Sequence, residues 1–315
     1  MSDSFQFGYE FRQPDESRSI YDAKTRLANQ LTSGSEASDS FTASDGAQVP
    51  YRVWRAMSAK ALVLLLHGAF DYCAAFDDLG AKCAARGITA MAIDQRGFGA
   101  TYSRGTWCGE SRMIADAVEA LKFLRARGGD SLPLFLIGES MGAAIAVHAA
   151  ANAEALNLAG VALAAPGAVP GTLLRLFGTL VAPILEYFTP NSGIVAIRLK
   201  EAELSPDAAR RFMSDPMVLH RIRPATLRGL LNLVRDAIDE AEGVRVPVLT
   251  MAGGKDDLIG ILQAQRLHQR FGGGKEWISF DGGPHLLLHW KQKALVCERL
   301  FAWLEARMSK SVRAS

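Results

Sequence analysis

Residues 132 to 147 are the stretch that most constrains what this chain can fold into. An apolar run of strand length leads directly into Gly-Glu-Ser-Met-Gly at 138–142, and an alanine-rich run without helix breakers follows. This order predicts a strand, a sharp turn and a helix. Glycines two residues before and after the serine remove side chains that would collide where the strand and the helix cross. We therefore expect the Ser140 hydroxyl to stand above the edge of a sheet.

The predicted turn has a chemical interpretation. The same pentapeptide also occurs by chance, as a plain Gly/Ser turn in an α/β protein, but its place between a strand and a helix favours a catalytic serine. The amide of Met141, at the start of the helix, would point to where a negative oxygen forms during attack on a carbonyl. We predict Ser140 as the nucleophile and the Met141 amide as part of an oxyanion hole.

Strand and helix patterns alternate on both sides of this turn. The continuous apolar run at 61–66 and the largely apolar runs at 88–93, 158–165 and 246–252 are typical of buried parallel strands, and helical stretches separate them. Two short alternating runs on either side of Asp45-Gly46 predict a tight turn between two strands. The handedness and packing rules for such alternation predict an α/β fold, a mainly parallel sheet with helices on both faces.

The chain divides into three predicted regions. Residues 1–40 are polar and predict an extension that lies on the main body or is partly disordered. Residues 41–166 and 243–315 predict the α/β core. The alternation breaks over 167–242, which predicts a helical cap above the carboxyl edge of the sheet. Its apolar stretch, 173–188, is interpreted as a helix buried in the cap, as a wall that receives an acyl chain and touches a membrane, or as both.

A serine hydroxyl near neutral pH needs a base that is oriented by a carboxylate. His285 follows a predicted strand that ends at Phe280, and Asp256 and Asp257 follow one that ends at Ala252. All three would lie at the carboxyl edge of the sheet, where open α/β sheets bind ligands. We predict His285 as the base and Asp256 as the acid that orients it, with Asp257 left open as the alternative.

The other histidines are weaker candidates for the base. His289 is the serious rival, because it lies only four residues after His285, in what we expect to be the first turn of the last helix. Structural roles are expected for His148 and His268 inside helices, and His220 has no partner in sight. His67 is expected to hold its loop by hydrogen bonding.

Five blocks of sequence together resemble the monoacylglycerol lipase and lysophospholipase group of α/β-hydrolases, over roughly 41–307. They are His67-Gly68, Asp94-x-Arg96-Gly97-x-Gly99, the pentapeptide at 138–142, Gly253-x-x-Asp256-x-Leu258 and the Gly-x-His285 region. The resemblance implies the α/β-hydrolase fold, with an eight-stranded, mainly parallel sheet and a helical cap inserted after the sixth strand. It also implies the roles given above to Ser140, Asp256 and His285.

The resemblance adds one residue and shows some departures. Ala69, which follows His67-Gly68, would give the second oxyanion amide. Relatives often have glycine where this chain has Phe70 and Ala143, and the Arg-Gly-x-Gly block ends in Ala-Thr instead of x-Ser. We expect Phe70 to narrow the site near the oxyanion hole and Ala143 to loosen helix packing slightly. None of these departures removes a catalytic atom.

The function expected from these features is hydrolysis of the carboxylic ester of a single-chain acyl lipid, a monoacylglycerol or lysophospholipid, through an acyl-serine intermediate. Within the same fold the alternatives are a short-chain carboxylesterase or thioesterase, an acyltransferase and a cofactor-free haloperoxidase-like enzyme. A small-molecule-binding protein without turnover is the alternative from another class. No cofactor and no metal is expected, because the chemistry calls for neither.

Composition and the chain start bound the location and partners. The formal charge is only +2, so nothing indicates nucleic acid as a partner. The four cysteines show no CxxC pair and indicate reduced thiols, and the first residues resemble no secretory signal. We expect a cytoplasmic protein, with a peripheral place at a membrane or micelle surface through the cap as a further expectation. The oligomeric state is left open.

Overall fold

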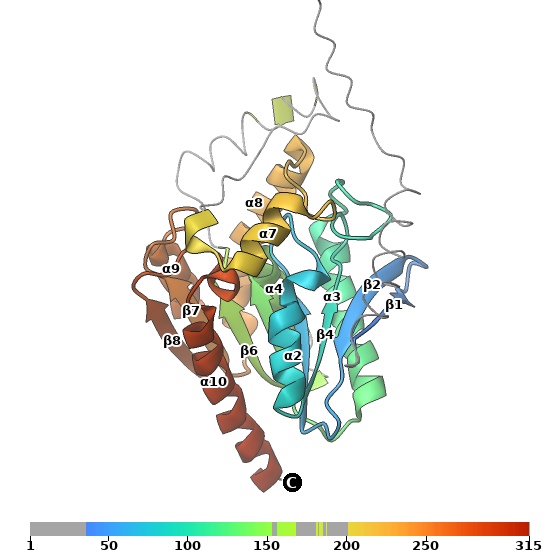
Figure 1. Cartoon of the computed structure of the whole chain (residues 1–315), viewed down its shortest axis with the longest axis vertical. Helices are drawn as coiled ribbons and strands as arrows, with labels where there is room; N and C mark the ends of the chain where they lie inside the picture. Colours follow the sequence, from blue (N-terminus) through green and yellow to red (C-terminus); the bar gives the residue numbers. More distant parts are fainter. Residues whose placement is uncertain are drawn as a thin grey trace, which may run out of the picture.

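Eight strands form one sheet in the computed structural model, which describes residues 36–152, 156–167, 181, 183, 184, 187 and 201–314. The strand order is β1-β2-β4-β3-β5-β6-β7-β8 (Figure 1). The bounds are β1 (Glu36–Thr42), β2 (Gln48–Trp54), β3 (Ala61–Leu66), β4 (Ile88–Ile93), β5 (Leu134–Glu139), β6 (Leu158–Ala164), β7 (Val248–Gly253) and β8 (Lys275–Phe280). The pairs β1/β2 and β2/β4 are antiparallel and all others are parallel. The predicted mainly parallel, eight-stranded sheet is confirmed.

The central strand β3 shows why its sequence is apolar throughout. It lies between β4 and β5, and all six of its residues are buried. Leu62, Leu64 and Leu66 belong to the core on one face of the sheet. Val63 and Leu65 belong to the core on the other face. A strand with helices on both faces has no solvated side, so a polar residue has no suitable place in it.

The helices cover both faces of the sheet, as the alternation predicted. Helices α3 (Glu110–Gly128), α4 (Met141–Asn152) and α9 (Ile261–Arg270) contribute to one core, and α2 (Asp77–Ala85) and α10 (Lys293–Ala314) to the other. Figure 1 shows α2 and α10 on the same face. None of the helices within the described ranges combines the length and the apolar character that crossing a bilayer requires.

Further helices lie at the end of the sheet where the cap was predicted. These are α7 (Pro206–Ser214) and α8 (Pro224–Glu240), and α8 packs against α4 (Figure 1). Ser205 caps α7, because its hydroxyl accepts a hydrogen bond from the Ala208 amide, and Pro206 occupies the first turn. Short 3-10 helices complete the described chain: η1 (Cys73–Phe76), η4 (Glu201–Glu203), η5 (Ala241–Gly243) and η6 (Leu287–His289).

Two of the predicted regions, the extension and the cap, lie only partly within the residues that the structure describes. The apolar stretch 173–188 lies outside the described residues except for positions 181, 183, 184 and 187, which are exposed. At the other end, β1 begins at Glu36, inside the predicted extension 1–40, and pairs with β2 from Glu36 opposite Trp54 to Thr42 opposite Gln48. The turn predicted around Asp45-Gly46 therefore joins two antiparallel strands, and the remaining residues of the extension lie outside the described range.

Backbone strain gathers at the carboxyl edge of the sheet. Three non-glycine residues there have positive φ: Phe70 at 78°, Ser140 at 55° and Ala165 at 43°. They follow β3, β5 and β6, which are neighbours in the sheet. Such values are uncommon for residues with a Cβ and persist only where surrounding contacts hold them. The strain indicates that the functional site lies at this edge.

Candidate active site

Ser140 sits on the sharp turn that the pentapeptide predicts. Its amide donates to the Ala164 carbonyl at 3.0 Å, and its own carbonyl accepts from Ala143 at 3.1 Å, so the turn is fixed to both β6 and α4. A Cβ added at Gly142 would lie 2.1 Å from the Leu66 carbonyl oxygen, and one at Gly138 would lie 2.2 Å from the carbonyl oxygen of Gly142. Only glycine fits at both positions, and the predicted strand, turn and helix are confirmed.

The structure brings Ser140, His285 and Asp256 into one hydrogen-bonded chain. The Ser140 Oγ lies 2.7 Å from His285 Nε2, and His285 Nδ1 lies 2.8 Å from Asp256 Oδ2. The amides of Leu258 and Ile259 both donate to Asp256 Oδ1 at 3.0 Å. The carboxylate is therefore fixed through both oxygens, and the imidazole can hold a proton on Nδ1 while Nε2 faces the serine.

The environment keeps the Asp256 carboxyl ionised. Burial favours the neutral form, but the hydrogen bond from His285 and those from the two backbone amides outweigh it, so the pKa of Asp256 lies below its usual value of 3.8. Its side chain is 6% exposed and that of His285 is 10% exposed. Asp257, the alternative acid, is exposed, and Asp256 is the residue paired with His285.

The loop after β3 lies against the serine. A Cβ added at Gly68 would be 3.4 Å from the Ser140 Cβ, so the loop that carries Ala69 passes next to the nucleophile. Met141 is the first residue of α4, where helix amides have no partner within the helix. The two residues predicted for the oxyanion hole thus lie on segments that flank Ser140.

His67 holds this loop, as its position predicted. Its Nδ1 lies 2.8 Å from the Gly68 carbonyl oxygen, and its Nε2 accepts from the Gln95 amide at 3.1 Å. Complete burial lowers the pKa of His67, which keeps the ring neutral and able to accept that hydrogen bond. His67 therefore joins the loops after β3 and β4.

His289 does not compete for the serine in the structure. It lies in η6, and α10 begins only at Lys293, so the predicted place in the first turn of the last helix is wrong. Backbone hydrogen bonds among residues 285–290 close short turns there instead of extending the helix. His289 Nε2 lies 3.0 Å from Glu139 Oε2. The role of Glu139 was not predicted, although its place directly before Ser140 was a usable signal.

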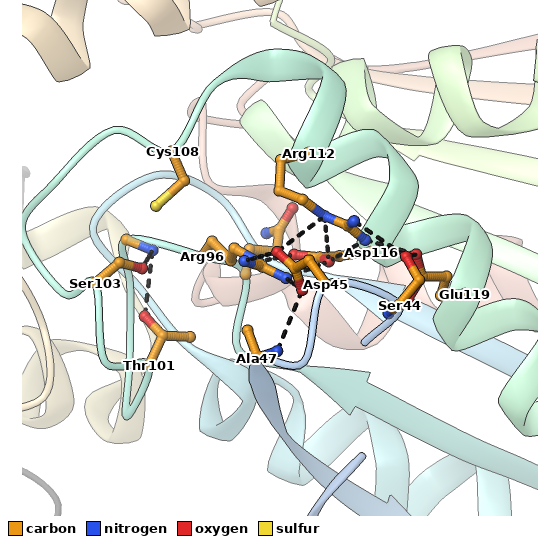
Figure 2. Close-up of polar contacts among 12 residues, drawn as sticks. Ser44, Asp45, Ala47, Arg96, Thr101, Ser103, Cys108, Arg112, Asp116 and Glu119 are labelled. Carbon is orange, nitrogen blue, oxygen red and sulfur yellow. Dashed lines mark hydrogen bonds and ion pairs between the residues drawn. The ribbon is translucent and has the colours of Figure 1, made fainter. Parts of the chain in front are cut away.

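The Arg96 block serves the structure rather than the chemistry. Arg96 donates two hydrogen bonds to Asp45 at 2.6 and 2.7 Å, and it also pairs with Asp116 at 2.6 Å (Figure 2). Arg112 pairs with Asp116 at 2.8 Å and with Glu119 at 2.6 Å. We call these five residues the arginine network. It joins the turn between β1 and β2, the loop after β4 and helix α3.

The two glycines of that block allow the loop to fold back on itself. A Cβ at Gly99, where φ is 57°, would lie 2.3 Å from Asp94 Oδ2. Asp94 in turn accepts hydrogen bonds from the amides of Cys73 at 2.8 Å and Ala100 at 2.7 Å. Gly97 has φ 89°, and a Cβ there would lie 2.4 Å from the Thr106 carbonyl oxygen.

Metal and thiol chemistry find little support among the residues described. Within those ranges, no group of three or more His, Cys, Asp or Glu side chains is placed to hold a metal ion. The four cysteines, all within the described ranges, form no disulfide, and Cys73, Cys83 and Cys297 are buried. Burial raises the pKa of each of these three thiols, which keeps them protonated and unreactive.

Two relatives resemble the chain over most of its length. Monoacylglycerol lipase of Mycolicibacterium smegmatis is 23% identical over 285 residues, which cover 88% of this chain and all of the relative. Human monoglyceride lipase is 24% identical over 284 residues, covering 86% of this chain and 91% of the relative.

A solved structure shows the same fold. The soluble variant of monoglyceride lipase from Saccharomyces cerevisiae, in complex with a substrate analogue, superposes with a TM-score of 0.71 at 22% identity, over 88% of this chain and 96% of that one. The family described as serine aminopeptidase, S33, matches residues 57–292, well over half of this chain. The chain is therefore an α/β-hydrolase of the serine aminopeptidase, S33, family, similar within it to the monoacylglycerol lipases.

Proposed function

We propose that this chain is a serine hydrolase that cleaves the carboxylic ester of a single-chain acyl lipid, a monoacylglycerol or a lysophospholipid. The observation that carries the proposal is the continuous hydrogen-bonded chain from Ser140 through His285 to Asp256. The same three groups can also attack an amide. The names of the relatives, monoacylglycerol lipase and monoglyceride lipase, favour an ester over the peptide bond in the family's description.

Acylation follows from the distances. Ser140 Oγ attacks the ester carbonyl carbon while its proton passes to His285 Nε2, 2.7 Å away. The ionised Asp256 stabilises the imidazolium that forms, through the hydrogen bond at Nδ1. The amides of Ala69 and Met141 donate to the developing oxyanion, and one such donor contributes about 3 to 4 kcal/mol in related enzymes.

Collapse of the tetrahedral intermediate breaks the carbon–oxygen bond to the leaving alcohol, which takes the proton from His285. Water then attacks the acyl-serine, and His285 removes its proton as general base. The second tetrahedral intermediate releases the fatty acid and returns the proton to Ser140. Every proton in this cycle moves through His285 Nε2, and the chain's own residues supply each step.

The domain arrangement and location are parts of the same proposal. Residues 41–166 and 243–315 form the catalytic core, 167–242 the cap, and 1–40 an extension. The protein is cytoplasmic, and its cap contacts a membrane or micelle surface transiently to take up the lipid substrate. The exposed side chains of Val181 and Ile184 support an apolar outer surface there, and the lack of a disulfide among the four described cysteines is compatible with a reducing compartment.

The test is ester hydrolysis by the wild type and Ser140→Ala side by side. p-Nitrophenyl esters from acetate to palmitate give the chain-length preference, and a monoacylglycerol and a lysophospholipid of the same acyl chain give the head-group preference. We expect activity that peaks at medium or long chains and disappears in the variant.

Other outcomes change the assignment. A peak at acetate would identify a short-chain carboxylesterase, and preferred cleavage of an acyl thioester would identify a thioesterase. No serine-dependent release from any ester would overturn the proposal and favour a binding protein.

A further inference from the structure

A second polar cluster touches the segments that carry Ala69, Ser140 and His285, and so three of the four segments with proposed catalytic groups. Its side chains are Glu139, Asp71, His289 and Arg211. The first directly precedes Ser140, the second lies two residues after Ala69, and the third lies four residues after His285. Only the fourth comes from outside these loops, since it belongs to α7. We call this set the second polar cluster.

Glu139 ties the serine turn to the histidine loop. Its Oε1 accepts a hydrogen bond from the Leu288 amide at 2.8 Å, and its Oε2 lies 3.0 Å from His289 Nε2. A carboxylate accepts hydrogen bonds, so these partners assign the imidazole proton to Nε2. His289 Nδ1, the other ring nitrogen, is then an acceptor.

Arg211 faces that acceptor and the oxyanion loop together. Its Nη2 donates to Asp71 Oδ2 at 2.9 Å and lies 3.5 Å from His289 Nδ1. Asp71 Oδ1 accepts from the Tyr72 amide at 2.9 Å, so the carboxylate is held in one orientation. One guanidinium nitrogen therefore connects the loop of Ala69 with the loop of His285.

The carboxylates of this cluster are buried, so the loss of the Arg211 guanidinium would be costly. The side chains of Glu139 and Asp71 are 1% and 4% exposed. His289 Nε2 lies 3.9 Å from Asp71 Oδ2, so the two carboxylates approach the same imidazole. A buried carboxylate that loses its cation is strongly unfavourable, and the loop that carries it moves to regain water or another donor. Removal of the guanidinium would therefore displace the Asp71 loop.

Other contacts fix α7 and its flanks to the same two loops. The Leu219 amide donates to the Phe70 carbonyl at 2.8 Å, and the Tyr72 hydroxyl donates to Asp215 at 2.6 Å. The Ser205 amide donates to the His289 carbonyl at 2.8 Å. The segment 205–219 is thus fixed to both loops, and Arg211 is its charged contact with Asp71.

We propose that Arg211 is a positioning residue. By pairing with Asp71 next to His289, it holds the loop that carries Ala69 in its position relative to Ser140 and His285. This role rests on the proposed function, because it acts through the Ala69 amide. An oxyanion amide stabilises the transition state more than the bound ester, so its displacement lowers kcat with little change in KM.

The test compares Arg211→Met with Arg210→Met, its exposed neighbour on the same helix, on the ester that the wild type cleaves best. We expect kcat of Arg211→Met to fall about 10- to 100-fold with KM nearly unchanged, the scale of a small misplacement in an active site. The rate of inactivation by a fluorophosphonate should fall in parallel, because its phosphoryl oxygen occupies the oxyanion position. Arg211→Lys should recover part of kcat, and Arg210→Met should match the wild type.

Asp71→Asn removes the same pair from the loop side and keeps the test valid if Arg211→Met does not fold. The double variant should fall no further than the worse single variant, because the two residues act as one unit. Unchanged kcat in Arg211→Met and Asp71→Asn, a loss confined to KM, multiplied losses in the double variant, or an equal loss in Arg210→Met would each overturn the proposal. Absence of serine-dependent turnover in the wild type would instead overturn the proposed function.

Discussion

The catalytic chain and the arginine network are both built from polar side chains on distant segments, but the pattern of contacts between their residues differs. The catalytic chain is linear: Ser140 contacts His285, and His285 contacts Asp256. In the arginine network, the contacts are redundant, since Asp116 pairs with both Arg96 and Arg112 (Figure 2). Directed proton transfer needs the first arrangement, and fastening a sheet edge to a helix benefits from the second.

The difference separates activity from stability. Loss of one residue interrupts a linear hydrogen-bonded chain, while loss of one residue from a redundant network leaves other pairs in place. Substitutions in the catalytic chain should therefore cost turnover with little change in unfolding. Substitutions in the arginine network should cost stability in graded steps while kcat/KM stays near that of the wild type.

The largest effect is expected for Asp256→Asn. The amide cannot hold His285 in the productive tautomer or stabilise its charge, so kcat should fall by about 10⁴-fold, as in related triads. Steady-state kinetics measure the loss, and a thermal melt should show a nearly unchanged midpoint. Asp257→Asn is the matched control at the adjacent, exposed position. An equal loss in that variant would show that the effect is not specific to Asp256 and would contradict its role as the acid.

Arg96→Met should give the largest effect on stability. The variant leaves Asp116, whose side chain is 1% exposed, with Arg112 alone and removes the bidentate pair with Asp45. We expect the free energy of unfolding to fall by about 2 to 4 kcal/mol, because breaking a buried pair is costly even when one partner remains. Urea denaturation measures it. A large loss of kcat/KM in folded protein would contradict the separation of the two regions.

Arg112→Met should cost less, about 1 to 2 kcal/mol, because Arg96 still neutralises Asp116 and the lost pair with Glu119 is partly exposed. The same urea titration applies. The double variant with Arg96→Met should lose more than the sum of the two, since Asp116 then has neither guanidinium. Simple additivity would show that the network is not redundant.

The smallest effect is a change in acid stability on Asp45→Asn. The hydrogen bond from Arg96 holds the pKa of Asp45 well below its ordinary value of 3.8. Protonation therefore favours the unfolded chain, and this contribution is present above the ordinary pKa and is lost as the pH falls below it. Between about pH 5 and pH 3 the melting temperature of Asp45→Asn should fall less than that of the wild type. The exposed Asp130→Asn should follow the wild type.

The sequence predicts the parts of the site that local patterns determine. An apolar run, a glycine-flanked serine and an alanine-rich helix place Ser140, because strand, turn and helix are contiguous. The strand patterns likewise place His285 and Asp256 at one edge, since parallel strands end on the same side of a sheet. The Gly253-x-x-Asp256-x-Leu258 pattern favoured Asp256 and left Asp257 open, and the structure pairs His285 with Asp256.

What the sequence does not predict depends on contacts between distant segments. Asp45 reads as a turn residue, and its pairing with Arg96 appears only when β1 and β2 join the edge of the sheet. Arg211 reads as a charge on a polar helix, yet it faces Asp71 and His289 because α7 lies across two loops. His289 carries a helical pattern that short turns override. Pairing across 51 residues, as between Asp45 and Arg96, or across 140, as between Asp71 and Arg211, leaves no periodic trace in a single sequence.

The strained residues along the reactive edge also bear on how this protein could be adapted to heat. Ala165 keeps a left-handed backbone while its amide donates to Met251 on the neighbouring strand at 2.8 Å. Glycine there would relax the local geometry, but it would also give the unfolded chain more conformations, so the two contributions oppose one another. Thermal tolerance would be better engineered at the opposite end of the strands. The strain at the reactive edge is thus a local conformational cost that accompanies a fixed backbone geometry at Phe70, Ser140 and Ala165.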